Sequence, residues 1–155
     1  MLMEGKFTLK APIQEVWDFL MRDPATLVSC MPGAEKMVAV DDKTLEGVMK
    51  QRVGIISVKI QGTLTFTEVN PPTHIKMVGR GSALGGMGTA TMECVANLRE
   101  IAQGEVELSY QMNISMVGRL ATFGERIMRA KIESTNLEFT NNLMNKLKEV
   151  QSKKA

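Results

Sequence analysis

Hydrophobic and polar positions alternate along most of the chain up to residue 117. Residues 3–10 place Phe7 and Leu9 on one side and lysine and threonine on the other, which predicts a short strand. Turn residues then separate six further alternating segments. We expect strands at 35–40, 44–53, 55–69, 74–82, 88–100 and 104–117. Because most of their connections are short, neighbouring strands should pair antiparallel.

Two short helices interrupt this pattern after the first strand. Pro12 occupies the position of a first helical residue, and apolar residues follow it at helical spacing, which predicts a helix over residues 12–21. Asp23 and Pro24 repeat the signal as an N-cap and a first-turn proline, so a second helix is expected over Ala25–Ser29.

The periodicity changes from two to about 3.6 after Gly118 and stays helical to Val150. This predicts one helix of about thirty residues, roughly 45 Å long. Its first apolar stripe consists of Leu120, Phe123, Ile127 and Ala130, and a later set consists of Leu137, Phe139, Leu143, Leu147 and Val150. The later set lies on another side of the cylinder, so either the helix bends or its halves face different surroundings.

These elements give the order β-αα-ββββββ-α and an α+β fold class. An antiparallel sheet that is apolar on one face must cover that face, and the last helix is the element long enough to do so. We therefore predict a seven-stranded curved sheet around a long C-terminal helix, as one domain over residues 1–150 with a short basic tail at 151–155.

Composition narrows the function classes. The formal charge of +2 is too small, and the basic residues too scattered, for a nucleic-acid-binding surface. The chain has neither a signal-peptide pattern nor an apolar run of the ~18 residues that a membrane span needs. Cys30 and Cys94 stand apart without a second ligand nearby, as in a reduced protein. We expect a cytoplasmic protein that does not bind nucleic acid.

The apolar face of the sheet carries few side chains capable of chemistry. Tyr110 and Cys94 are its titratable residues, while the only histidine, His74, falls on the opposite face. Catalysis needs an acid, base or nucleophile with a tuning partner, and zinc needs three or four converging ligands. We therefore expect no catalytic site, metal or cofactor. Tyr110 either satisfies a backbone group or orients the polar end of a ligand.

The space between this face and the long helix is the predicted binding cavity. Methionine is frequent, at 13 of 155 residues, and its flexible thioether suits either a variable apolar partner or a repacked core. We expect the cavity lining to be Ile60, Leu64, Phe66, Met77, Met92, Cys94, Leu108, Tyr110, Met112, Leu120, Phe123 and Ile127.

The glycine-rich segment 79–88 invites interpretation as a phosphate loop. Such a loop requires a helix directly after it, whereas Thr89 begins a strand pattern. The segment therefore predicts a flexible hairpin, and we expect its turn at the cavity mouth, formed by Leu84, Gly85, Gly86 and Met87.

Basic residues gather in two groups of the last helix. The first consists of Arg119, Arg126, Arg129 and Lys131, and the second of Lys146, Lys148, Lys153 and Lys154. A solvated helix face explains either group, and so does docking to anionic lipid or to an acidic partner.

Five short motifs occur in a characteristic order. They are Ala11-Pro12-Ile13-Gln14-Glu15-Val16-Trp17, the turn Met31-Pro32-Gly33-Ala34-Glu35, the run Val53-Gly54 to Gly62, the turn Asn70-Pro71-Pro72, and Gly118-Arg119-Leu120-Ala121 with Gly124 before Arg126. With the element order, they resemble the helix-grip fold of the START/Bet v 1 (SRPBCC) superfamily and, within it, the CoxG family of carbon monoxide dehydrogenase subunits. The resemblance spans nearly the whole chain. It implies a hydrophobic-ligand domain accessory to a molybdenum-containing CO dehydrogenase or related hydroxylase, linked to its assembly or membrane association.

Three functions follow as hypotheses. The first is a non-catalytic carrier for a lipid- or quinone-like molecule, peripheral to the inner face of the membrane and serving an oxidoreductase partner. The second is a cyclase- or dehydratase-like enzyme that pairs Tyr110 with an inward helix residue such as Ser134. The third is a protein-interaction module with a filled core, which predicts no internal void of the usual ~300–1,000 Å³.

Overall fold

One antiparallel sheet of seven strands forms the body of the protein, in the order β1-β7-β6-β5-β4-β3-β2. The computed structural model describes residues 1–154, apart from the side chains of Pro24, Ala25 and Lys154. The strands are β1 (Leu2–Leu9), β2 (Ala34–Ala39), β3 (Thr44–Val53), β4 (Ile56–Asn70), β5 (His74–Ala83), β6 (Gly88–Ala102) and β7 (Glu105–Val117).

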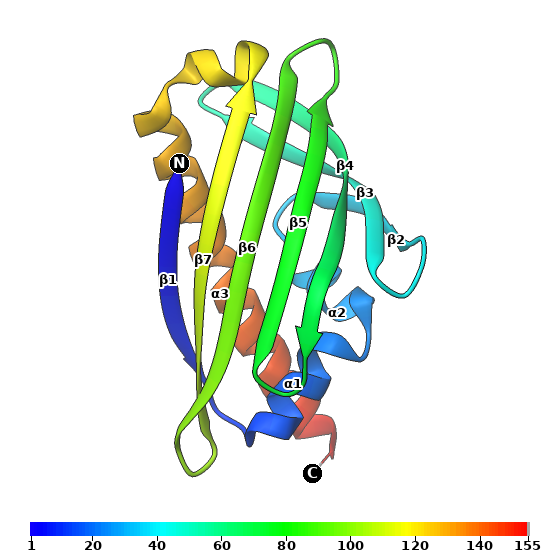
Figure 1. Cartoon of the computed structure of the whole chain (residues 1–155), viewed down its shortest axis with the longest axis vertical. Helices are drawn as coiled ribbons and strands as arrows, with labels where there is room; N and C mark the ends of the chain where they lie inside the picture. Colours follow the sequence, from blue (N-terminus) through cyan, green and yellow to red (C-terminus); the bar gives the residue numbers. More distant parts are fainter. Residues whose placement is uncertain (155) are drawn as a thin grey trace.

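Four helical segments complete the fold. They are α1 (Ile13–Met21), α2 (Pro24–Cys30), the 3-10 helix η1 (Gly118–Phe123) and α3 (Glu125–Lys154). The sheet curls in front of α3, which runs down behind it, while α1 and α2 lie near the lower end (Figure 1). The predicted α+β helix-grip architecture is therefore confirmed.

The last helix begins later than its periodicity predicted. Residues 118–123 form η1, and Gly124, with a φ of 86°, separates it from α3. The break shifts the helical phase, so Met128 is buried while Ile127 is 53% exposed. The expectation that Leu120 and Ile127 share one helical stripe was therefore wrong. At the other end α3 continues through residues 151–154, which we expected as a tail, and Ala155 lies outside the described residues.

A row of glycines lets the sheet bend. Gly47, Gly62 and Gly81 pair with one another across β3, β4 and β5. A Cβ added at Gly62 would overlap the carbonyl oxygen of Arg80, and one at Gly81 would lie 2.6 Å from Cγ2 of Ile60. Neighbouring strands therefore come closer together at these glycines than side chains would allow. Figure 1 shows the resulting bend, in which β3 and the first part of β4 pass behind the other strands.

The inner face carries two separate packed clusters. The lower cluster joins α1, α3 and the sheet, and its centre includes Val16, Trp17, Val106 and Leu143. The upper cluster consists of Val58, Ala83 and Leu120, with residues of the β5–β6 turn and η1 packed against them. On β6, Ala90 contacts the upper cluster and Ala96 belongs to the lower one. The stretch of inner face between them is the candidate site.

Candidate functional site

Strand register brings the predicted lining residues together between the two clusters. One row across β4 to β7 consists of Phe66, Met77, Cys94 and Met112, and the next consists of Leu64, Gly79, Met92 and Ile114. Cys94 is buried, whereas the other side chains of these rows are half-buried. The result is a flexible, apolar surface of methionine and leucine that neither cluster covers completely.

Other residues expected in the lining have more varied positions. Leu108 and Leu120 are buried members of the lower and upper clusters, and Ile60 and Phe123 pack against the upper cluster. Ile127 points largely to solvent. In the turn that we expected at the mouth, residues 84–86 are exposed and Met87 is half-buried against the upper cluster. The structure thus brings Leu64, Met77, Met92 and Met112 together at the site itself.

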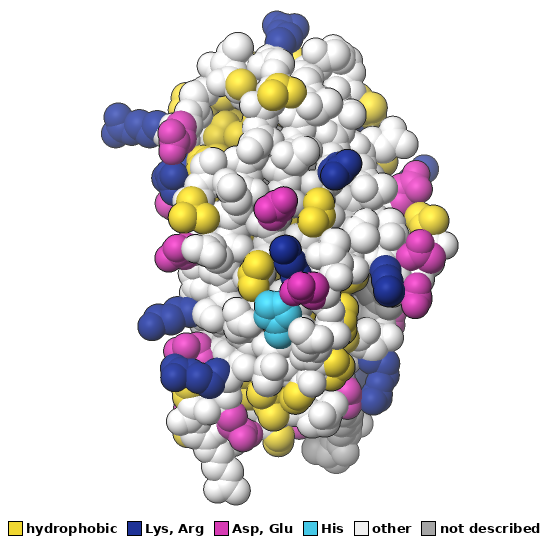
Figure 2. Space-filling model, in the orientation of Figure 1, with side chains coloured by type: hydrophobic (Ala, Val, Ile, Leu, Met, Phe, Trp, Pro, Cys, Tyr) yellow, Lys and Arg dark blue, Asp and Glu magenta, His cyan; other side chains and the backbone are white. Residues whose placement is uncertain are grey.

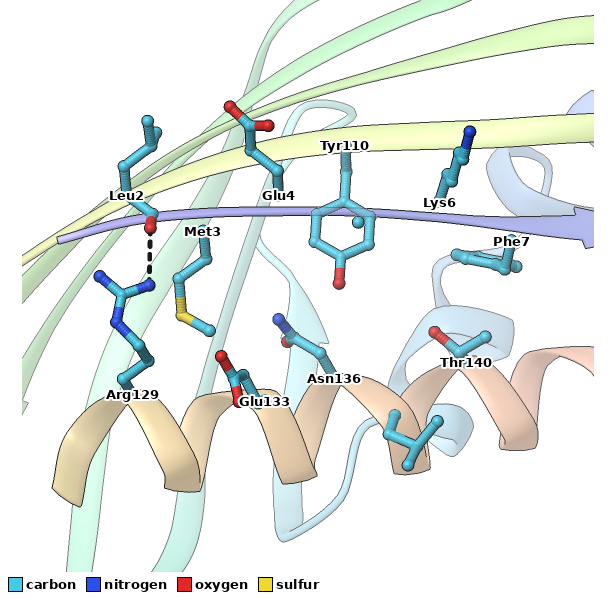
Figure 3. A pocket seen from close by; sticks show the side chains of 12 residues that line it. Leu2, Met3, Glu4, Lys6, Phe7, Tyr110, Arg129, Glu133, Asn136 and Thr140 are labelled. Carbon is cyan, nitrogen blue, oxygen red and sulfur yellow. Dashed lines mark hydrogen bonds between the residues drawn. The ribbon is translucent and has the colours of Figure 1, made fainter. Parts of the chain in front are cut away.

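A groove of about 320 Å³ opens between the edge strand β1 and α3. Met3, Phe7 and Tyr110 point from the sheet toward the helix, and Glu133 and Asn136 point from the helix toward the sheet (Figure 3). The groove thus places polar side chains of α3 beside apolar side chains of the sheet.

Tyr110 reaches the groove because its neighbour on β1 is a glycine. Gly5 pairs with Tyr110, and a Cβ at Gly5 would lie 2.5 Å from the phenol oxygen. The ring thus occupies the space that a side chain would take. Burial raises the pKa of Tyr110, a hydrogen-bonding interaction with Asn136 partly opposes this, and the charge of Glu133 adds to the increase. The phenol is therefore a neutral hydrogen-bond donor at physiological pH.

Polar contacts fix α3 against β1 beside this phenol. The guanidinium of Arg129 donates to the backbone oxygen of Leu2 at 3.0 Å and to the Glu125 carboxylate at 3.0 Å (Figure 3). The Asn136 amide donates to the sulfur of Met112 at 3.6 Å. Asn136 therefore connects the groove to the methionine-lined inner face.

Sequence reasoning chose the wrong helix partner for Tyr110. Ser134 is exposed, and Asn136 lies beside the phenol instead. The roles of Gly5, Arg129 and Glu133 in the groove were also missed. A glycine within an alternating strand often marks close approach of another group, so Gly5 was the available signal.

The remaining titratable candidates lie away from this groove or are buried. His74 is on the outer face, as predicted, where Nε2 lies 2.9 Å from Glu68 and Nδ1 lies 2.8 Å from Oδ1 of Asn97. Hydrogen bonding to Asn97 and Glu68 raises its pKa. Figure 2 shows this histidine among acidic and basic side chains. Burial raises the pKa of the Cys94 thiol to about 11, which leaves it protonated at neutral pH.

Exposed aliphatic side chains gather at the upper end of the molecule. Ile55 in the β3–β4 turn is 91% exposed, and Leu84, Val117 and Ile127 are each about half exposed. Backbone hydrogen bonds connect the segments that carry them, from Leu84 to Lys59 and from Leu120 to Met87. Figure 2 shows hydrophobic and basic side chains together near this end.

The basic groups of the last helix differ in their ion pairs. Arg129 pairs with Glu125, and Lys146 and Lys153 both approach Glu149. Within the described part of the chain, Arg119 and Arg126 at the upper end form no ion pair. The side chain of Lys154 lies outside the described residues.

Two further features are absent within residues 1–154. No helix there combines the length and the apolar character that crossing a membrane requires. His, Cys, Asp and Glu side chains of the described residues form no group of three suited to a metal ion.

Comparison with known proteins identifies relatives of this fold. The model of the CoxG family of carbon monoxide dehydrogenase subunits matches residues 5–148. A conserved protein from Geobacillus kaustophilus superposes with a TM-score of 0.88 at 22% identity over 96% of both chains. The ZhuI aromatase/cyclase of a Streptomyces species superposes with a TM-score of 0.69 at 12% identity over 96% of this chain and 93% of that one.

A third solved structure, Ara h 8.0201, has a TM-score of 0.66 at 9% identity, covering 96% of this chain and 98% of that one. At these identities the structural similarities show the fold alone. Among curated proteins, none matches the sequence significantly.

Proposed function

Because the chain belongs to the CoxG family of carbon monoxide dehydrogenase subunits, we propose that it is a non-catalytic carrier for a hydrophobic small molecule. The ligand, lipid- or quinone-like, lies between the inner face of the sheet and α3. The observation that carries this proposal is the half-buried surface of Leu64, Met77, Met92 and Met112 between two packed clusters. Methionine adapts its shape to variable apolar partners, so this surface suits a flexible hydrophobic molecule.

The polar groups near this surface favour binding over catalysis. No polar or charged side chain is buried among the described residues, and an acid or base is usually tuned by such burial. Tyr110 stays protonated because its pKa is raised, and Glu133 is exposed to water. A cyclase-type reaction would need a tuned proton acceptor beside the substrate, so we favour the carrier over the enzyme.

The family also suggests the partner. We propose that the carrier serves a molybdenum-containing oxidoreductase of the CO dehydrogenase type, whose electrons pass to an apolar acceptor such as an isoprenoid quinone. Affinity-tagged protein should therefore co-purify with such an enzyme from its host. Recovery without any molybdenum enzyme would argue against the partnership while leaving ligand binding untouched.

A membrane surface is the expected source or destination of the ligand. The upper end combines exposed aliphatic side chains with the exposed Arg119 and Arg126. Exposed aliphatic side chains can insert into the headgroup region of a bilayer. Each arginine near an anionic membrane surface adds ~1 kcal/mol to the free energy of binding. We propose that this end docks on anionic lipid. Ile55→Asp should weaken sedimentation with phosphatidylserine vesicles, whereas Ile101→Asp, beside the β6–β7 turn at the opposite end, should not.

Ligand binding can be tested on the natively purified protein. Solvent extraction followed by mass spectrometry should release one apolar molecule per chain. Met112→Trp fills the inner face, so this variant should release no such molecule. Gln111→Trp changes the adjacent, exposed position on the outer face, so that variant should still release it. An empty wild-type protein, or equal cargo in both variants, would contradict the carrier function.

A further inference from the structure

The groove between β1 and α3 has the chemistry of a carbonyl-binding subsite. We propose that it holds the polar end of the ligand, where Tyr110 donates a hydrogen bond to a carbonyl oxygen of a neutral apolar molecule, such as a ketone, ester or quinone. This inference rests on the proposed function and adds to it the orientation and chemical class of the ligand.

The hydroxyl group of Tyr110 is placed to act as a donor. Asn136 lies beside the phenol and lowers its pKa, while the amide nitrogen of Asn136 donates to the sulfur of Met112. Figure 3 shows the phenol oxygen of Tyr110 directed into the groove, toward α3. The Tyr110 hydroxyl, which carries one proton, can therefore donate to a ligand in the groove.

The charges around the phenol favour a neutral acceptor over an anion. The carboxylate of Glu133 lies in the same groove and raises the pKa of Tyr110, so it repels a phosphate or carboxylate. Arg129, the cation of the groove on α3, already bonds to Leu2 and Glu125. A carbonyl oxygen can accept the hydrogen bond from Tyr110. Because it carries no net charge, Glu133 does not repel it.

The groove is next to the apolar surface. Tyr110 and Met112 lie two positions apart on β7, on the same face of the sheet, and Asn136 contacts the Met112 sulfur. Met112 begins the row that continues through Cys94 and Met77 to Phe66. In this proposal the carbonyl lies at Tyr110 and the apolar part of the molecule lies toward the adjacent methionines.

Benzophenone and diphenylmethane form a matched pair of probes, because they differ only in the carbonyl group. Wild-type protein should bind benzophenone more tightly. Tyr110→Phe, which removes only the hydroxyl, should weaken benzophenone binding about five- to tenfold, the value of one hydrogen bond, and leave diphenylmethane unchanged. Gly5→Ala should likewise weaken benzophenone binding, because the added Cβ would displace the phenol of Tyr110.

Two further measurements on the same samples report the location. The infrared carbonyl stretch of bound benzophenone should shift to lower frequency in wild type and lose that shift in Tyr110→Phe. On irradiation, benzophenone should crosslink to residues 3–7 or 133–140, which border the groove.

The outcomes separate the two proposals. If both probes bind equally to wild type and Tyr110→Phe, or if crosslinks map to the turn at 84–87, the carbonyl subsite is refuted while apolar binding stands. If neither probe binds, the proposed function itself is refuted. Selective loss of benzophenone binding together with its infrared shift supports the subsite.

Discussion

Gly62→Ala tests whether the bend of the sheet depends on the absence of a side chain. The added Cβ would overlap the carbonyl oxygen of Arg80 and lie 2.8 Å from Cα of Gly81. Because backbone atoms of a paired strand cannot rotate away, β4 and β5 must separate locally. Overpacking of this kind costs about 2–4 kcal/mol of unfolding free energy, or roughly 3 °C of Tm for each kcal/mol in a chain of this size.

Gly79→Ala is the matched control on the same face of the sheet. Its Cβ would lie 3.4 Å from the terminal methyl group of Met92, an ordinary contact, so the cost should stay below ~1 kcal/mol. Urea unfolding can be followed by the fluorescence of Trp17, which is buried and is the only tryptophan. Equal unfolding midpoints for the two variants would refute the steric account of the bend.

Three further predictions concern titratable groups. Absorbance titration of the only tyrosine, Tyr110, should give a pKa above the ordinary ~10, and Glu133→Gln should lower it; an unshifted value would contradict the burial of the phenol. Its contribution to stability is complete below the unfolded pKa and is lost as the pH rises through the folded one. Proton NMR of the only histidine, His74, should likewise show a raised pKa that falls in Glu68→Gln, and its stabilisation is lost as the pH rises through that value. In a Cys30→Ala background, the Cys94 thiol, with a pKa of about 11, should react with Ellman's reagent only after unfolding, and rapid labelling of the native protein would show that the site of Cys94 is open.

The strands and the inner face were predictable because a period of two assigns each side chain to one face. The alternation along β7 placed Leu108, Tyr110 and Met112 on the inner face, and the structure agrees. Short turns can join antiparallel strands, whereas parallel strands need a long crossover connection. The order of β3 to β7 therefore followed from the short connections.

The helix side of the site could not be predicted in the same way. The positions of side chains around α3 depend on the residue at which the helix begins, and a 3-10 segment ending at Gly124 is compatible with the same apolar spacing. The predicted helical phase was wrong by one or two residues. We therefore expected Ile127 and Ser134 on the inner side of the helix, where the structure has Met128 and Asn136. The groove depends on this phase and on the pairing of Gly5 with Tyr110, which joins residues far apart in the chain.

The most direct test of the carrier function is methyl NMR of protein labelled at methionine, titrated with diphenylmethane. Met77, Met92 and Met112 lie on the inner face between the clusters, whereas Met37 lies on the edge strand β2. We expect the methyl signals of the first three to shift with saturation and that of Met37 to remain in place. Unchanged signals from Met77, Met92 and Met112 at saturating probe would contradict an apolar binding site on this face.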